Sequence, residues 1–507
     1  MMLNEPLDPS DSLHFKELAK PILIFQVIEG LRRGLSRFLG PSRVGLLLSF
    51  QESEPLLVFD PHGLLSEHQS EIRSHFLDSL AWRQHSSSLR GVLDANSCPG
   101  PELPRLICWG RRSASVYYQM WFAERPPNLC SAGPVEAWLA KASWILAHEL
   151  AMGASLYTSS ATHTLESYSL YAVCDHLIAQ LRKVLQAEPP FRVEDVLKSV
   201  AGISTTYEEG KLAVGALMFL SPKALGEVTG IVRFPDGSCP SIKDLKHVRK
   251  LLTMVEGTQR FLVSNGVSIL GIGHGTMPHG ALLARFKGGH GELQLGSHLV
   301  CTFRDGEYSG LGRSPELHDL QLALGRKTRD MASRSKVLHA VAKLVKHAWD
   351  RSHGCTIVVD FGRPVRAIAG QRLEQPISVI DNLDLIEGMS KVDGALHIDS
   401  EGELHAFACL LDGRAVATED RSRGARYNSA LRFTADYPAA LAVVVSADGP
   451  VSILESGRQI NLPQVWSAQD SVYMTQPTLQ DWLAAASPAQ PSAMPQASQP
   501  MRRDTLT

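Results

Sequence analysis

Close cysteine pairs and long apolar runs are both missing from this sequence. Its 8 cysteines are scattered, and no CxxC motif occurs among them, so the pattern favours neither a zinc site nor a disulfide framework. No apolar run reaches the roughly 18 residues that a membrane-spanning helix needs. The first 11 residues are acidic and lack the apolar core of a signal peptide. We therefore expect a cytoplasmic protein with no membrane partner.

A charge excess of one sign is also missing. The 50 lysine and arginine residues nearly balance the 52 acidic residues, which gives a net charge of −2. No global polycation argues for nucleic acid, and we predict no nucleic-acid partner. The 44% hydrophobic and 20% charged content is typical of a globular protein. A chain of 507 residues has room for roughly two to four domains.

Residues 12–150 predict a small α/β domain. The helical and strand-like segments are, in order, 13–38, 44–50, 56–59, 106–109, 115–123 and 135–150. This order of elements resembles a GAF or PAS sensor module, although element order is the only basis for that analogy. Residues 151–190 then predict a helical connector with an apolar stripe. A helix packed on its own domain fits that stripe and is preferred over a dimerising signalling helix.

The rest of the chain divides into three parts that differ in composition. Residues 191–330 contain short apolar runs divided by Gly, Pro and Asp, which predicts a strand-rich middle domain without a recognised catalytic motif. Residues 486–507 are rich in Ala, Ser, Pro and Gln, which predicts a disordered tail. Between them, residues 331–460 predict an α/β domain with a mixed sheet flanked by helices.

Residues 391–430 carry most of the chemical information. Asp393 precedes an apolar run, a turn signal and a second apolar run, so we expect a hairpin with this carboxylate at the edge of a sheet. Alone, an Asp before Gly is more often a turn residue. Gly424-Ala425-Arg426 follows, and Ser429 can open a helix. N–H groups at a helix start, together with an arginine, favour phosphate binding. Arg421 and Arg423 are interpreted as loop charges that raise the local potential.

These motifs resemble those of the diadenylate cyclase (DAC) family. Asp393-Gly394-Ala395 is similar to its Asp-Gly-Ala motif, and residues 424–428 are similar to its Gly-Thr-Arg-His-Arg phosphate loop. Residues 390–392 fit the branch that contains the DNA-integrity-scanning protein. The resemblance covers roughly residues 335–460 and departs at residues 427–428 and 447–448, where the family has His-Arg and an acidic pair. The nucleotide-binding residues that it implies are Gly394, Ala395, Gly424, Ala425, Arg426, Tyr427, Asn428, Ser429 and Ser446.

The resemblance implies that two ATP molecules condense into cyclic di-AMP with release of pyrophosphate. Asp393 is the implied catalytic residue and the implied ligand of a divalent metal, Mg²⁺ or Mn²⁺. One domain of this family binds one ATP or a related adenine nucleotide, so a chain with a single copy implies a homo-oligomer. The alternative is a catalytically impaired nucleotide sensor. Asn428 replaces a basic donor to phosphate, and losing one such donor typically costs about 2.7–4 kcal/mol of barrier.

Overall fold

The structure is a computed structural model that divides into two compact units. The larger unit comprises Met1–Leu311 and Val465–Thr507, and the smaller unit comprises Gly312–Gln464. The described residues are 9–79, 81–83, 97–98, 100–152, 160–228, 232–312, 317–351, 353–420, 422–446, 451–461 and 476–485. The predicted tail at 486–507 and residues 447–448 lie outside them. Among the described helices, none combines the length and the apolar character of a membrane-spanning segment.

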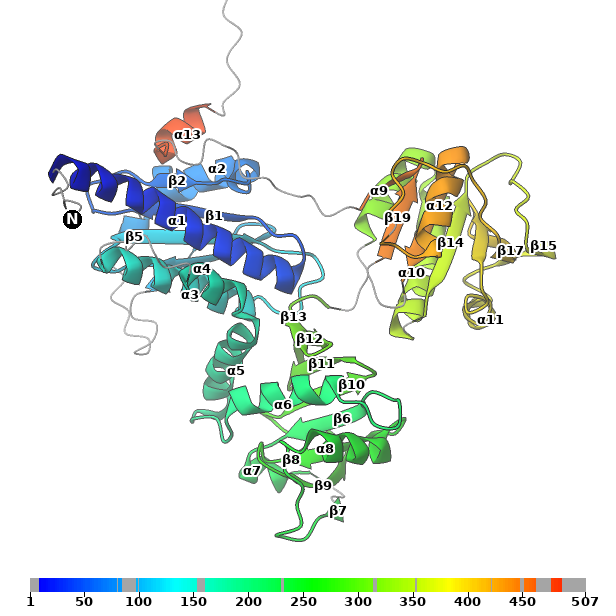
Figure 1. Cartoon of the computed structure of the whole chain (residues 1–507), viewed down its shortest axis with the longest axis horizontal. Helices are drawn as coiled ribbons and strands as arrows, with labels where there is room; N and C mark the ends of the chain where they lie inside the picture. Colours follow the sequence, from blue (N-terminus) through cyan, green and yellow to red (C-terminus); the bar gives the residue numbers. More distant parts are fainter. Residues whose placement is uncertain are drawn as a thin grey trace, which may run out of the picture. The chain divides into compact units, whose positions relative to one another are not determined.

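The first sheet of the larger unit has five antiparallel strands in the order β2-β1-β5-β4-β3. Figure 1 labels β1, β2 and β5 of this sheet, with α1 beside them. Its strands are β1 (Val44–Ser49), β2 (Leu57–Phe59), β3 (Ser97–Cys98), β4 (Leu106–Arg111) and β5 (Tyr118–Glu124). Its helical segments are α1 (Pro9–Leu39), η1 (Leu65–His68), α2 (Gln69–Arg73), η2 (Ser74–Asp78), η3 (Ala81–Arg83), α3 (Gly133–Ala151), α4 (Ser160–Glu166) and α13 (Leu479–Ala485).

Both faces of this sheet are covered, because side chains along a strand point to opposite faces in turn. Leu46 and Trp121 face a core shared with α1 and α3. Leu47 and Phe122 face a second core shared with α2, η2 and α13. The segment that leads into α13 pairs with the edge of the sheet beside β2, since Thr478 forms an isolated bridge with Leu57 and the Leu479 N–H donates to the Leu56 carbonyl at 2.7 Å. The chain thus returns to its first sheet more than 400 residues later.

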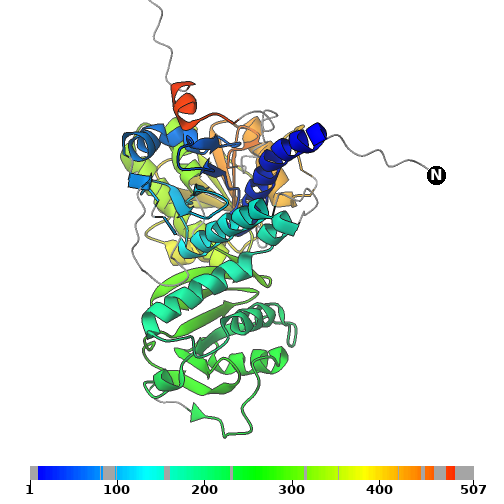
Figure 2. The same cartoon turned by 90° about the vertical axis from the view of Figure 1, so that its left-hand side faces the viewer.

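The second sheet of the larger unit has eight strands in the order β13-β12-β11-β10-β6-β8-β9-β7. Its strands are β6 (Val214–Phe219), β7 (Val232–Arg233), β8 (Arg260–Ser264), β9 (Ile269–His274), β10 (Leu282–Lys287), β11 (His290–Leu295), β12 (His298–Arg304) and β13 (Glu307–Ser309). Its helical segments are α5 (Ser169–Leu185), α6 (Val193–Thr205), α7 (Pro222–Leu225), α8 (Leu245–Leu252) and η4 (Thr253–Val255). Figure 2 shows the green strands with α6 and α8 beside them.

Helix α5 buries its apolar stripe within the larger unit. Ala172, Val173, Leu177 and Leu181 have no exposed surface, and they belong to one continuous core that runs from α1 through α5 to the second sheet. The helix packs on α3, α6 and β13. The interpretation of this stripe as a packing surface therefore matches the contacts that the structure shows.

The smaller unit contains a mixed sheet of seven strands in the order β15-β17-β16-β14-β18-β19-β20. Its strands are β14 (Cys355–Asp360), β15 (Gln371–Ser378), β16 (Ala395–Asp399), β17 (Glu403–Cys409), β18 (Ala440–Val445), β19 (Val451–Glu455) and β20 (Arg458–Gln459). Its helices are α9 (His318–Lys327), α10 (Met331–Asp350), α11 (Leu383–Met389) and α12 (Ala425–Asp436). β14 runs parallel to β16 and antiparallel to β18.

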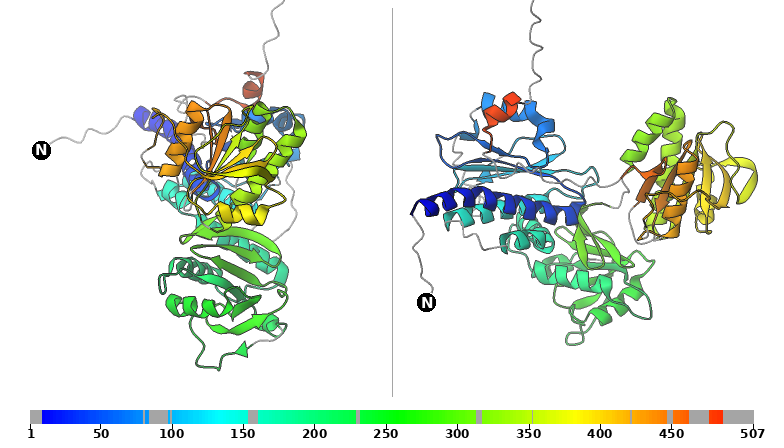
Figure 3. Two further views of the ribbon diagram at one scale, coloured as in Figure 1. Left: turned by 90° about the vertical axis from the view of Figure 1, so that its right-hand side faces the viewer. Right: turned by 45° about the horizontal axis from the view of Figure 1, so that its top comes forward.

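Helices lie on both faces of this third sheet (Figure 3, left). Ile357 and Val443 face the core of α9, α10 and α11, whereas Val358 and Val444 face the core of α12. Strands that are buried on both faces explain the continuous apolar runs in the sequence. The expected multidomain α/β class, with a C-terminal mixed sheet flanked by helices, is confirmed.

Candidate functional site

Three sequence segments meet at one end of the strands of the third sheet. The central strands β14 and β16 begin at this end, and β18 ends there because it runs antiparallel to β14. The start of α12 lies at the same end of the sheet. The segments before β16, after β18 and at the start of α12 therefore meet, although up to about fifty residues separate them in the sequence.

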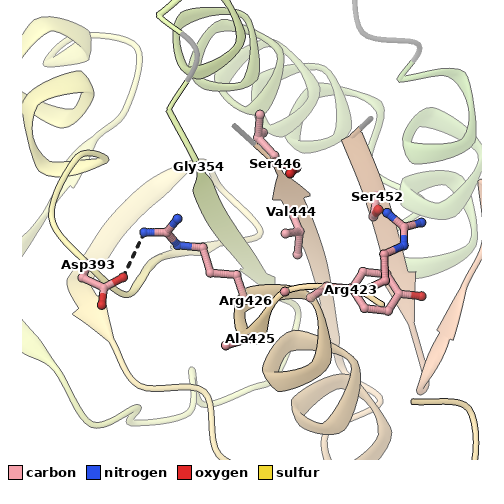
Figure 4. A pocket seen from close by; sticks show the side chains of 11 residues that line it. Gly354, Asp393, Arg423, Ala425, Arg426, Val444, Ser446 and Ser452 are labelled. Atoms are coloured by element: carbon pink, nitrogen blue, oxygen red, sulfur yellow. Dashed lines mark hydrogen bonds and ion pairs between the residues drawn. The ribbon is translucent and has the colours of Figure 1, made fainter. Parts of the chain in front are cut away.

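A pocket of about 370 Å³ lies where these segments meet (Figure 4). Its lining residues are Gly354, Asp393, Arg423, Gly424, Ala425, Arg426, Tyr427, Val444, Val445, Ser446 and Ser452. Six of the ten residues that the sequence implied for the site line it: Asp393, Gly424, Ala425, Arg426, Tyr427 and Ser446. The volume is within the range of small-molecule sites.

Asp393 and Arg426 form an ion pair across the pocket. Nη2 of Arg426 donates to Oδ1 of Asp393 at 2.9 Å. The Asp393 side chain is 94% exposed and that of Arg426 is 44% exposed, and exposed pairs contribute little stability. Gly354 makes room for the arginine, because a Cβ there would lie 2.3 Å from its Nη1. Both charged groups are thus open to a ligand that competes for them.

Gly394 and Ala395 position Asp393 and do not line the pocket. Gly394 has φ +118°, and a Cβ there would lie 2.4 Å from the carbonyl carbon of Ala408, so only glycine fits without strain. Ala395 is 1% exposed and opens β16, packed in the core beneath α12. In the Asp-Gly-Ala motif, the glycine therefore makes a tight turn, the alanine begins a buried strand, and the aspartate stays exposed just before that strand.

Helix α12 begins at Ala425, with Gly424 as its N-cap. The sequence placed the helix start at Ser429, which is wrong by four residues. The first N–H groups of a helix have no intrahelical acceptor and carry partial positive charge. Because the pocket is lined by Gly424, Ala425 and Arg426, those N–H groups belong to the same anion-friendly site as the guanidinium.

Asn428 and Ser429 do not line the pocket. Nδ2 of Asn428 donates to the carbonyls of Asp420 at 2.9 Å and of Arg423 at 3.2 Å, and its Oδ1 accepts from the Asp420 N–H at 3.2 Å. Oγ of Ser429 donates to the carbonyl of Arg426 at 3.2 Å. Asn428 therefore fastens the loop that leads into α12, and its side chain contacts backbone groups.

Arg423 lines the pocket, so its interpretation as a loop charge is incomplete. Its guanidinium lies over the Tyr427 ring, 4.7 Å from the centroid, and its Nη2 donates to Oε1 of Gln459 at 3.1 Å. In Figure 4, Arg423 lies beside Ser452, whereas Arg426 points toward Asp393. The sequence offered little signal for Arg423. Its place in the pocket follows from its position directly before the N-cap Gly424, whereas the sequence pattern predicted a later helix start, at Ser429.

The surroundings shift the pKa values of several nearby groups. Burial raises the pKa of the Cys355 thiol to about 12, which excludes a thiolate nucleophile at neutral pH. Burial, together with His347 and neighbouring cations that include Arg426, lowers the pKa of His353. Burial raises the pKa of the Tyr427 phenol. Asp393 is thus the acidic group in the pocket lining.

Three family models match successive parts of the chain. Residues 18–187 match a probable sensor domain, DACND, and residues 194–301 match a probable sensor domain, DACNH. Residues 342–459 match a model described as DAC, DisA bacterial checkpoint controller nucleotide-binding. The comparison with curated proteins found no match.

Two solved structures share similarity with part of the chain. A double mutant of DacA from Staphylococcus aureus is 21% identical, with a TM-score of 0.21, over 26% of this chain and 90% of that chain. A hypothetical membrane spanning protein from Bacillus cereus is 19% identical, with a TM-score of 0.20, over 29% of this chain and 78% of that chain. The family assignment depends on the matched model and on the motifs that line or position the pocket: residues 342–459 are a domain of the DAC nucleotide-binding family.

Proposed function

We propose that the pocket binds ATP or a related adenine nucleotide, and that two such domains condense two ATP molecules into cyclic di-AMP. The observation that carries this proposal is the meeting of Asp393 and Arg426 in one pocket at the start of α12, within a domain of a nucleotide-binding family. A carboxylate and a phosphate site side by side are what a nucleotidyl transfer requires.

The start of α12 supplies the groups that would hold the phosphates. Free N–H groups and the positive helix end favour an anion there. A phosphate can displace the exposed Asp393 carboxylate from Arg426, because their ion pair is weak. Arg423 offers a second guanidinium from the other side of the same pocket. Asn428 fixes the carbonyl of Arg423, so this residue positions a cation even though it carries no charge.

In the proposed reaction, the 3′-hydroxyl oxygen of one ATP attacks the α-phosphorus of the other. The new phosphodiester bond forms as the bond to pyrophosphate breaks, and the hydroxyl proton passes to solvent. The reciprocal attack closes the ring, so two ATP molecules give one cyclic di-AMP and two pyrophosphates. Asp393 would accept a hydrogen bond from the attacking hydroxyl and orient it, while Arg426 stabilises the charge that develops on the phosphate.

The pocket residues fit a divalent metal held jointly with the substrate. Asp393 and Ser446 present oxygen atoms, which Mg²⁺ and Mn²⁺ prefer. No group of three or more His, Cys, Asp or Glu residues is placed to hold a metal within the described part of the chain. The phosphates and water would therefore complete the shell, as is usual for Mg²⁺. When bound, such a metal would lower the pKa of the hydroxyl and neutralise phosphate charge.

A nucleotide sensor without turnover is the second candidate. The observation that favours it is the engagement of Asn428 with the loop backbone, at the position where the resemblance implies a basic residue. Two domains matching probable sensor models precede the DAC domain, so a chain that only reports nucleotide levels is chemically consistent. The two candidates share the binding site and differ in turnover.

One experiment separates them. Purified full-length protein is incubated with ATP and Mn²⁺ or Mg²⁺, and cyclic di-AMP is measured by mass spectrometry while ATP binding is measured by calorimetry. A cyclase gives product that Asp393→Asn abolishes, with ATP affinity within a few fold of wild type. A sensor gives binding without product. Protein that neither binds adenine nucleotides nor makes a cyclic dinucleotide overturns both proposals.

A further inference from the structure

A second pocket, of about 490 Å³, lies on the first sheet of the larger unit. Its lining residues are Gly100, Pro101, Glu102, Leu103, Pro104, Leu106, Ile107, Cys108, Arg125, Ala132 and Glu136. They come from the segment before β4, from β4 itself, from the residue after β5 and from the beginning of α3. The pocket therefore belongs to the part of the chain that matches a probable sensor domain.

One wall of this pocket is stiff. Pro101 and Pro104 each fix a backbone angle in the segment before β4. Gly100 lies so close to the strand that a Cβ would come 2.7 Å from Cβ of Cys108. Leu103 is 8% exposed and packs into the core on the other side of the sheet from α1. A wall that is formed before a ligand arrives lowers the entropy cost of binding.

Two opposite charges face the pocket without meeting each other. Glu136 lies in the first turn of α3, and Arg125 directly follows β5. Neither side chain has a hydrogen bond or an ion pair with any residue that the structure describes. They are nevertheless near neighbours: burial raises the pKa of Glu136, and Arg125 acts in the opposite direction. Glu136 is half-buried, and a half-buried charge without a partner is costly, so a cationic group of a ligand would relieve that cost. Arg125 is exposed and free to pair with an anionic group of the same ligand.

We propose that this pocket binds a small zwitterion, with its ammonium group at Glu136 and its carboxylate at Arg125. A molecule with both groups pairs both charges at once, which a simple amine or a simple acid does not. Leu103, Leu106 and Ile107 provide apolar surface for the body of the ligand. Glu102 adds an exposed carboxylate at the rim, so a zwitterion with a further cationic group gains another partner. Free amino acids, and basic ones first, are the ligand class that matches this arrangement.

The experiment measures binding to the full chain by calorimetry and by the shift in melting temperature. L-lysine and L-leucine are the zwitterionic probes, 1,5-diaminopentane is the amine probe and hexanoate is the acid probe. Glu136→Gln and Arg125→Gln should each weaken zwitterion binding by about tenfold or more, since each leaves one ligand charge unpaired. Glu136→Asp keeps the charge and should retain part of the affinity. Glu149→Gln, on the same helix but outside the pocket, should change nothing.

The outcomes either support the proposal or overturn it. Binding of at least one amino acid that both neutralising variants lose and the control variant keeps supports it. Absence of binding by either amino acid overturns it. Diaminopentane or hexanoate that binds as tightly as the amino acids overturns the zwitterion class. The melting temperatures without ligand show whether a variant has lost its fold, and Glu136→Asp then carries the comparison.

Discussion

At the residue scale, the two arginines of the DAC pocket make separable predictions. Arg426→Gln and Arg423→Gln should each weaken ATP binding by about tenfold or more, because each removes a charged donor to phosphate. Calorimetric titration with ATP measures the effect. Arg414→Gln is the matched control, since Arg414 is exposed and does not line the pocket. If Arg423→Gln behaves like this control, Arg423 is only a loop charge.

Two glycines of the smaller unit test the backbone argument. Gly394→Ala should destabilise the protein by about 1–3 kcal/mol, because an alanine must adopt a strained positive φ against Ala408. Gly388→Ala, in α11 with no atom near its Cβ, should stabilise it by about 0.5–1 kcal/mol. Urea unfolding of both variants measures the difference. Equal stabilities would contradict the close approach of β16 and β17 at Ala408.

The sequence predicted the pair Asp393 and Arg426, because a short motif determines both the turn and the residue at its mouth. It did not predict Arg423, Ser452 or Gly354. Those residues line the pocket because of the register between strands and the position at which α12 begins. Both depend on contacts between distant parts of the chain. Asn428 is the opposite case: it belongs to the motif but does not face the pocket, because its side chain donates to backbone carbonyls of the loop. Local pattern thus predicts which segments meet, and packing decides which side chains face the space between them.

At the element scale, α13 is predicted to hold the first sheet together. Leu483 is 3% exposed in the core that α13 shares with Phe76 and Phe122. Leu483→Ala should therefore cost about 2–5 kcal/mol. Gln480→Ala, on the exposed side of the same helix, should change stability little. Hydrogen exchange of β2 amides, read beside urea unfolding, tests this: a Leu483→Ala variant with unchanged β2 protection would show that the helix is dispensable.

The far end of β14 makes a prediction about pH. Asp360 is 1% exposed and accepts from His397, Tyr437 and the N–H groups of Gly362 and Arg366. Burial alone would raise its pKa, but these hydrogen bonds outweigh burial and lower it. A lowered carboxyl pKa stabilises the fold above the unfolded value of about 4, and the gain is lost as pH falls through the folded pKa.

The loss of unfolding free energy that Asp360→Asn causes, relative to wild type, should consequently be largest at neutral pH. The gap between wild type and variant, measured by urea unfolding, should be constant from about pH 7 to pH 5 and narrow below about pH 4. Glu403→Gln, exposed at the start of β17, is the control for general acid effects. A gap that widens in acid would contradict the assignment of these hydrogen bonds to the ionised form.

Elements with strong periodicity were predictable, and short ones were not. The apolar runs at 44–50 and 115–123 correspond to β1 and β5, and the stripe at 135–150 corresponds to α3. α13 has only 7 residues, too few to be stable without tertiary packing, so its sequence alone gives little signal. The start of α12 was missed because Gly424 as N-cap, followed by Ala425 and Arg426, also suits a loop.

At the scale of the whole molecule, the cyclase proposal requires a partner. The chain carries a single DAC domain, and the reaction joins two ATP molecules, so two chains must face each other. Cyclic di-AMP formed per chain per minute should therefore fall as the protein is diluted through its dissociation constant, while ATP bound per chain stays the same. Mass photometry at each concentration provides the assembly state. Turnover independent of dilution, in samples shown to be monomeric, would contradict this requirement.

Domain order along the chain was accessible to sequence reasoning, but the division into units was not. Motifs and composition separate residues 331–460 from what precedes them. The contact between Leu56 and Leu479 joins residues far apart, and no local pattern announces it. The smaller unit is consequently an insertion between two parts of the larger one.

This insertion has a consequence for synthesis on the ribosome. Leu479 and Leu483 complete the core that η1, α2 and β5 begin, yet they emerge only after the whole DAC domain. This core of the first sheet therefore remains incomplete while more than 150 residues of the smaller unit are translated. Domains usually fold as units while the chain emerges. Here the unit that is started first is finished last, so its exposed core is the surface that a chaperone would meet on the nascent chain.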